Sequence, residues 1–131
     1  MSFVRFATIA AALVAAPLAV PAQAAENQPY SQAAFEAAQA AGRPILIDVH
    51  AWWCPVCGSQ ARTIRDTVTA PQYDKLLVLR INYDKQKADW QKLGVKKQAT
   101  LIAYHGTRET GRIQYMTDKA KIKDLIASTL R

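Results

Sequence analysis

The pattern of apolar and polar positions changes period several times along the chain. Where apolar residues recur every three or four positions we expect a helix, and where short β-branched runs lie between turn residues we expect a buried strand. The sequence therefore predicts, in order, a helix over 31–41, a strand over 45–49, a helix over about 54–68, a strand over 76–81, a short helix over about 88–93, strands over 100–104 and about 110–115, and a final helix from 117 or 118. Residues 26–30 lack an apolar pattern and are expected to be a polar leader.

Capping residues support several of these boundaries. Ser31 is a typical N-cap, and Gly42 can take the left-handed conformation that ends a helix. Thr117 or Asp118 is expected to cap the last helix. Its buried stripe is predicted to consist of Ile122, Leu125, Ile126 and Leu130.

Strands that alternate with helices predict an α/β fold, with helices on both faces of one central sheet. The last two strands are close enough to form an antiparallel hairpin across residues 105–108, so the sheet should be mixed. We expect four strands. Repeats and a second domain are not indicated by the sequence.

The first residues have the composition of a targeting segment. An apolar run over 6–20 follows Arg5, and Ala22-Gln23-Ala24 is a small-x-small cleavage site. The run is too short for a bilayer span of about 20 residues, although a retained anchor is the alternative. We therefore predict a signal peptide over 1–24, a mature domain over 25–131, and a periplasmic or secreted protein that does not contact the membrane after cleavage.

The formal net charge is +7, and the sequence pI is about 9.7. The basic residues are spread along the chain and do not form a dense block with interleaved aromatic residues, so nucleic acid binding is not indicated. Solvated helix and strand faces account for this charge. A preference for acidic partners or for the membrane surface is the alternative interpretation.

The only cysteines are Cys54 and Cys57, in the order Cys54-Pro55-Val56-Cys57. A disulfide that closes so short a loop removes little entropy from the unfolded chain, so a redox role explains the spacing better than a structural one. A shared metal ion is a further alternative. Covalent haem attachment is excluded, because Gly58 stands where a histidine would follow the second cysteine.

The residues around this pair resemble the active site of the thioredoxin superfamily. Asp48, Ala51, Trp53, Cys54 and Cys57 all fall at the positions of the family pattern, after an apolar strand. The resemblance covers about residues 31–130 and implies a thioredoxin-like fold that lacks the family's optional first strand. It also implies a protein thiol–disulfide oxidoreductase that acts on disulfide-containing proteins with a thiol electron donor and needs no cofactor.

The resemblance also implies roles for individual residues. Cys54 would attack a disulfide, Cys57 would resolve the mixed disulfide, and Asp48 would carry a proton for Cys57. Arg80 stands where many members have a lysine, and it should hold Asp48 ionised more firmly. His50 is either a second proton carrier or a packed side chain. The substrate-binding positions are expected to be Trp53, Pro55, Val56, Gln98, Ala99 and Thr100.

Besides His50, which stands where many members have tryptophan, two features separate this sequence from typical members. Pro55-Val56 lacks the histidine that stabilises the thiolate of strong oxidants, so we expect a reducing or intermediate couple. Ala99 replaces the family's cis-proline, and a cis alanine would cost about 2.5–4 kcal/mol. We therefore expect a trans Gln98–Ala99 bond, a displaced loop with more room above Cys54, and low general reductase activity.

Loss of that proline also keeps other functions open. A carrier of a metal ion or an iron–sulfur cluster is the main alternative. The potential ligands are the two cysteines, His50 and His105, but His105 lies at a distant hairpin, so a closed zinc site is not expected. A third hypothesis is that the protein is a non-catalytic adaptor with a thioredoxin-like fold. We expect a monomer, or a dimer if a metal or cluster bridges two chains.

Overall fold

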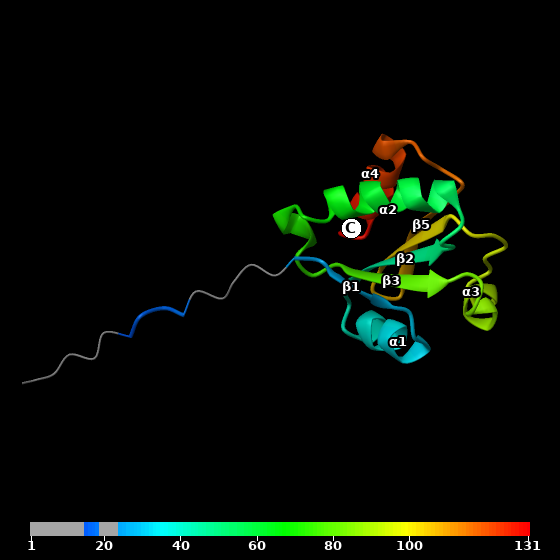
Figure 1. Cartoon of the computed structure of the whole chain (residues 1–131). Helices are drawn as coiled ribbons and strands as arrows, with labels where there is room; N and C mark the ends of the chain where they lie inside the picture. The colour runs from blue at the N-terminus through cyan, green and yellow to red at the C-terminus, as the bar shows by residue number, and fades with distance from the viewer. Residues whose placement is uncertain (1–14, 19–23) are drawn as a thin grey trace, which may run out of the picture.

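A computed structural model gives the structure of residues 15–18 and 24–131 (Figure 1). The strands are β1 (Glu26–Pro29), β2 (Pro44–His50), β3 (Leu77–Asn82), β4 (Thr100–His105) and β5 (Arg108–Gln114). The helices are α1 (Gln32–Ala40), α2 (Pro55–Thr67), α3 (Lys87–Lys92) and α4 (Lys119–Ser128), with a short 3-10 turn at Pro71–Tyr73. The predicted signal peptide lies mostly outside these residues, and none of the helices described is long and apolar enough to cross a membrane.

The sheet has five strands in the order β1-β3-β2-β4-β5. β1 and β2 both pair with β3 in parallel, whereas β4 runs antiparallel to β2 and to β5. The α/β class and the mixed sheet are therefore confirmed. The expected count of four strands was wrong, because residues 26–29 form the edge strand β1 instead of a polar leader.

Helices cover both faces of the sheet, with α2 and α4 on one face and α1 and α3 on the other (Figure 1). β2 shows how the sequence divides between the two faces. Ile45, Ile47 and Val49 belong to the core on the α1 side, whereas Leu46 packs in the core with α2 and α4. Because side chains alternate along a strand, Asp48 and His50 point to the same face as Leu46.

Most predicted boundaries agree with the structure to within about two residues. The side chains of Ser31 and Asp118 accept hydrogen bonds from backbone N–H groups at the starts of α1 and α4, which confirms both caps. Leu130 was placed wrongly in the buried stripe of the last helix. It is 39% exposed because α4 ends at Ser128.

Candidate active site

The two cysteines lie at the start of α2, just after the central strand β2. Cys54 is the N-cap of α2, with Pro55 in the first turn, where its missing N–H leaves no hydrogen bond unmade. The backbone N–H of Cys57 donates a hydrogen bond to Cys54 Sγ over 3.1 Å. This N–H and the positive end of the helix dipole both favour negative charge on that sulfur.

The two thiols differ in their surroundings. Cys57 is fully buried and Cys54 is 5% exposed, and both pack with Ala51 and Ala99. Burial, followed by the hydrogen bond with Cys54, raises the pKa of Cys57 to about 12, although backbone hydrogen bonds from Ala51 and Ala99 oppose the shift. Cys57 is therefore a protonated thiol at neutral pH, which is the state expected of a resolving cysteine before it is activated.

Asp48 lies on β2 with its side chain in the interior. Arg80 donates two hydrogen bonds to Asp48 Oδ2, from Nε over 3.0 Å and from Nη2 over 2.9 Å. Burial raises the pKa of Asp48, and the attraction of Arg80 and His50 opposes that rise. The expected partnership with Arg80 is confirmed. Even so, the carboxyl holds its proton more firmly than an exposed aspartate does.

His50 follows on the same face of β2. Burial, and then the positive charge of Arg80, lower the pKa of His50, while Asp48 opposes this effect. His50 is therefore neutral at pH 7. Within the described chain, neither His50 Nδ1 nor Asp48 Oδ1 has a hydrogen-bond partner, although both atoms are buried.

Ala99 ends the loop that leads into β4 and is fully buried. The Gln98–Ala99 bond is trans, as predicted, but the loop does not open the site. Ala99 takes the left-handed conformation, with φ of 59°, and packs against both cysteines. The expected extra room above Cys54 is therefore not found.

Hydrogen bonds on both sides hold Ala99 in this strained conformation. Its N–H donates to Val49 O over 2.9 Å, and its carbonyl accepts from the Tyr115 N–H over 2.9 Å and from Gln60 Nε2 over 3.1 Å. Gln60 is fully buried and also donates to Met116 O. Our sequence analysis missed Gln60, although a polar residue three positions after Cys57 on the inner side of a helix was an available signal.

An aromatic cluster flanks the cysteines on the solvent side. Trp53 is 46% exposed, and its indole N–H donates to both carboxylate oxygens of Asp84 over 3.1 and 3.2 Å. Its ring meets Tyr83 edge-on, and Tyr83 stacks on Trp90, a buried packing residue. Trp52, the residue before Trp53, is 86% exposed.

The predicted substrate-binding residues divide into two groups. Trp53 and Pro55 are exposed and Val56 is partly buried, so these three border the surface beside Cys54. Gln98, Ala99 and Thr100 are buried. The Gln98 amide donates to the Tyr115 hydroxyl and Thr100 Oγ1 donates to Lys97 O, so both side chains are already bonded within the protein.

The potential metal ligands are not brought together. His105 Nδ1 lies 2.7 Å from Thr129 O at the far end of β4. In the part of the chain that the structure describes, no three residues among histidine, cysteine, aspartate and glutamate form a group that could hold a metal ion.

Known proteins are similar to this chain in both architecture and sequence. A model of the thioredoxin family matches residues 26–128. The thioredoxin of Alicyclobacillus acidocaldarius subsp. acidocaldarius is 26% identical over 101 residues, which are 77% of this chain and 95% of that protein. Trxlp from Edwardsiella tarda EIB202 is 40% identical, with a TM-score of 0.74 over 77% of this chain and 98% of that one.

A more distant thioredoxin, from Malassezia sympodialis, is 18% identical and has a TM-score of 0.69 over 82% of this chain and 95% of that one. It supports the fold alone. Together with the family match over 26–128, these relatives confirm the resemblance noted in the sequence. The chain belongs to the thioredoxin family, and this membership supports the general activity of a thiol–disulfide oxidoreductase.

Proposed function

We propose that this protein is an exported protein-disulfide oxidoreductase that works as a reductase or electron relay for particular partner proteins. The difference between the two thiols carries this proposal. Cys54 Sγ accepts a hydrogen bond at a helix N-terminus, whereas the Cys57 thiol is buried and its pKa is raised to about 12. One sulfur is prepared to attack, and the other remains protonated until a mixed disulfide forms.

The reaction has two exchange steps. The Cys54 thiolate attacks one sulfur of a partner disulfide, which forms a mixed disulfide and releases the other partner sulfur as a thiolate. Cys57 then loses its proton and attacks Cys54 Sγ, which closes the Cys54–Cys57 disulfide and releases the second partner sulfur. Two electrons pass from the dithiol to the partner, and a thiol donor restores the dithiol.

We assign Asp48 as the base that accepts the proton when Cys57 is deprotonated. Its carboxyl is buried and has a raised pKa, and a general base works best when its pKa is near the working pH. Arg80 opposes the rise in the pKa of Asp48, first through its positive charge and then through its hydrogen bonds to Oδ2. The guanidinium is half-exposed, so it lowers the pKa of Asp48 less strongly than a buried guanidinium would, because water screens its charge.

The backbone contacts of Ala99 favour particular partners over general reduction. Thioredoxins act on disulfide-containing proteins with a thiol reductant. Here both backbone groups of Ala99 are already bonded inside the protein, so this residue has neither a free N–H nor an uncommitted carbonyl for an incoming chain. Recognition would then depend on the exposed surface around Trp52, Trp53 and Pro55.

Export is proposed because the sequence predicts a signal peptide over residues 1–24, which would place the mature domain in the periplasm or outside the cell. The Pro55-Val56 pair supports the reducing direction, since it lacks a side chain that would stabilise the Cys54 thiolate further. N-terminal sequencing of the protein recovered from the periplasm or the medium tests the export claim. Recovery of an uncleaved chain in the cytoplasm would contradict it.

Insulin reduction, measured beside metal and iron–sulfur analysis of anaerobically purified protein, tests the activity. We expect slow but measurable reduction that is lost in Cys54→Ser, and no bound metal or cluster. A protein that carries stoichiometric metal or cluster and does not exchange disulfides would instead be the thiol-based carrier. A protein that does neither would be an adaptor.

A further inference from the structure

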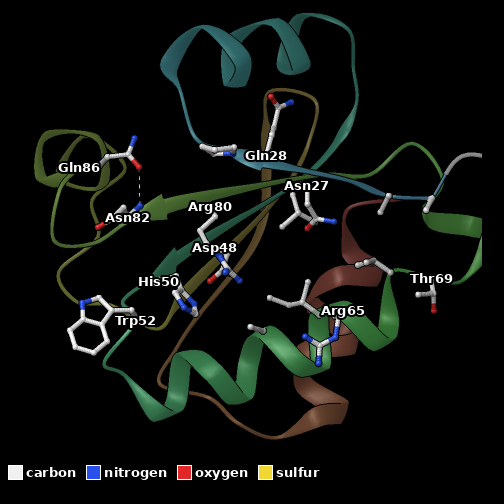
Figure 2. Close-up of a pocket in the computed structure, with 17 residues that line it drawn as sticks. Asn27, Gln28, Asp48, His50, Trp52, Arg65, Thr69, Arg80, Asn82 and Gln86 are labelled. Carbon is white, nitrogen blue, oxygen red and sulfur yellow. Dashed lines mark hydrogen bonds and ion pairs between the residues drawn. The ribbon is translucent and has the colours of Figure 1, made fainter.

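A cavity of about 710 Å³ lies between α2 and the strands β1, β2 and β3. Figure 2 shows it from the side, with Trp52 near one end and Thr69 near the other. Its volume is within the range of about 300–1,000 Å³ that is typical of small-molecule sites. Neither cysteine lines it, and Asp48 is the one residue of the proposed exchange reaction that does.

Two polar side chains that line the cavity, Asp48 and His50, each have a buried atom without a hydrogen-bond partner. Asp48 is almost completely buried, and Arg80 occupies only one of its two oxygens. No group of the described chain donates to Asp48 Oδ1, and His50 Nδ1 beside it is also buried without a partner. A buried carboxylate oxygen without a partner is unfavourable, so a ligand that donates a hydrogen bond to Asp48 Oδ1 would be favoured here.

The charges at the cavity favour an anion. Asp48 and Arg80 cancel when both are ionised, and His50 is neutral because its pKa is lowered. Arg65 also lines the cavity, from α2, and has no ion-pair partner within the described residues. One positive charge is therefore uncompensated if Asp48 is ionised, and two are uncompensated if it is protonated.

One wall of the cavity is apolar. Ile64 and Val68 line it from α2, and Val78 lines it from β3. All three are otherwise part of the core between the sheet and α2. These side chains are already nearly buried, so the gain would come mainly from removing the ligand's own apolar body from water.

We propose that this cavity binds a small organic anion that combines an apolar body, one negative charge and a neighbouring N–H donor. The anionic group would lie near the guanidinium groups of Arg65 and Arg80. The N–H would donate to Asp48 Oδ1, and the apolar body would cover Ile64, Val68 and Val78. The proposal does not depend on the dithiol reaction.

N-phenylacetylglycine carries all three features and can serve as the test compound. Two close analogues each lack one feature: phenylacetylglycinamide lacks the charge, and O-phenylacetylglycolate has an ester oxygen in place of the N–H. With about 14 non-hydrogen atoms at ordinary ligand efficiency, the acid should bind with a Kd of about 1 mM. Amide NMR spectra of the reduced protein, titrated to about 10 mM, should show saturable shifts at the cavity residues, and each analogue should bind about tenfold more weakly.

Arg65→Gln should reduce the preference for the acid over the amide to about twofold or less. Arg62→Gln is the matched control, since Arg62 is an exposed arginine on the same helix outside the cavity lining. Ala61 also lines the cavity from α2, so Ala61→Trp should block binding by filling this space. Its folded state is checked by the dispersion of the same spectra.

Equal affinity for all three compounds would overturn the proposal. So would shifts that do not saturate, or shifts that map away from the cavity. If Arg65→Gln and Arg62→Gln behaved alike, the assigned charge would be wrong. Because the readout is binding, loss of insulin reduction has no bearing on these outcomes, and each proposal can fail separately.

Discussion

Replacement of Arg80 by methionine tests how the buried carboxyl is controlled. Methionine keeps much of the apolar side chain but removes the two hydrogen bonds that Arg80 donates to Asp48 Oδ2. Hydrogen bonds to a charged group contribute about 1.5–3 kcal/mol. The Arg80 side chain is 48% exposed, so solvent screening reduces the effect, and we expect Arg80→Met to lower the free energy of unfolding by about 2 kcal/mol at pH 7.

The pH dependence of this loss has a definite sign. The pKa of Asp48 is raised in the folded state above its ordinary value of 3.8, mainly by burial. The native state therefore binds this proton more tightly than the unfolded state. That contribution to stability is fully present below the unfolded pKa and is lost as the pH rises through the folded pKa.

Arg80 opposes the rise, so its removal moves the folded pKa of Asp48 further upward. The pH interval over which stability falls is then longer in Arg80→Met, and each additional pH unit removes about 1.4 kcal/mol. The difference between the variant and the wild type should be small near pH 4 and should grow towards pH 8.

Urea unfolding at a series of pH values measures this difference in unfolding free energy. In thermal unfolding at pH 7, the midpoint temperature of Arg80→Met should fall by about 10 °C. Arg112→Met is the matched control, because Arg112 pairs with Glu109 at the surface, where ion pairs contribute about 0–1 kcal/mol. Equal losses in both variants at every pH would refute the reasoning. So would a loss in Arg80→Met that shrinks as the pH rises.

Three further predictions concern the dithiol and its loop. Iodoacetamide at pH 8 should label Cys54 before Cys57 in the reduced protein, because the pKa of Cys57 is raised to about 12; mass spectrometry showing the reverse would exchange their roles. Ala99→Pro should destabilise the fold by about 3 kcal/mol, since proline cannot adopt φ of 59° or donate the N–H. Ala99→Gly should change stability by less than about 1 kcal/mol, and equal unfolding free energies for the two variants would contradict this reasoning. Asp48→Asn should slow resolution of the mixed disulfide about tenfold or more and flatten its pH profile; an unchanged profile would make the carboxyl structural.

Local signals allowed most of the fold to be predicted. The helices and inner strands have clear apolar periods, and Ser31 and Asp118 mark helix starts through ordinary capping chemistry. β1 was missed because Glu26-Asn27-Gln28-Pro29 is polar and ends in proline. It is a strand only because the exposed edge of β3 offers it a partner, and a single sequence does not contain that long-range pairing.

The site was predictable where it depends on motif and covalent geometry. Cys54, Cys57 and Asp48 lie where the pattern placed them, and the trans Gln98–Ala99 bond follows from the cost of a cis alanine. The left-handed conformation of Ala99 was not predictable. It depends on Gln60, which reaches across from α2 to the Ala99 carbonyl, and such tertiary contacts leave little local trace.

Trapping of mixed disulfides in Cys57→Ser tests the central claim most directly. Removing the resolving thiol should leave partner proteins bound through Cys54, and these adducts should be released by dithiothreitol and identified by mass spectrometry as Cys54 disulfides. Cys54→Ser should trap no partners, because the thiol of Cys57 is fully buried and its pKa is raised to about 12. Equal trapping by both variants, or no adducts from Cys57→Ser, would contradict the assignment of Cys54 as the nucleophile of a protein-disulfide oxidoreductase.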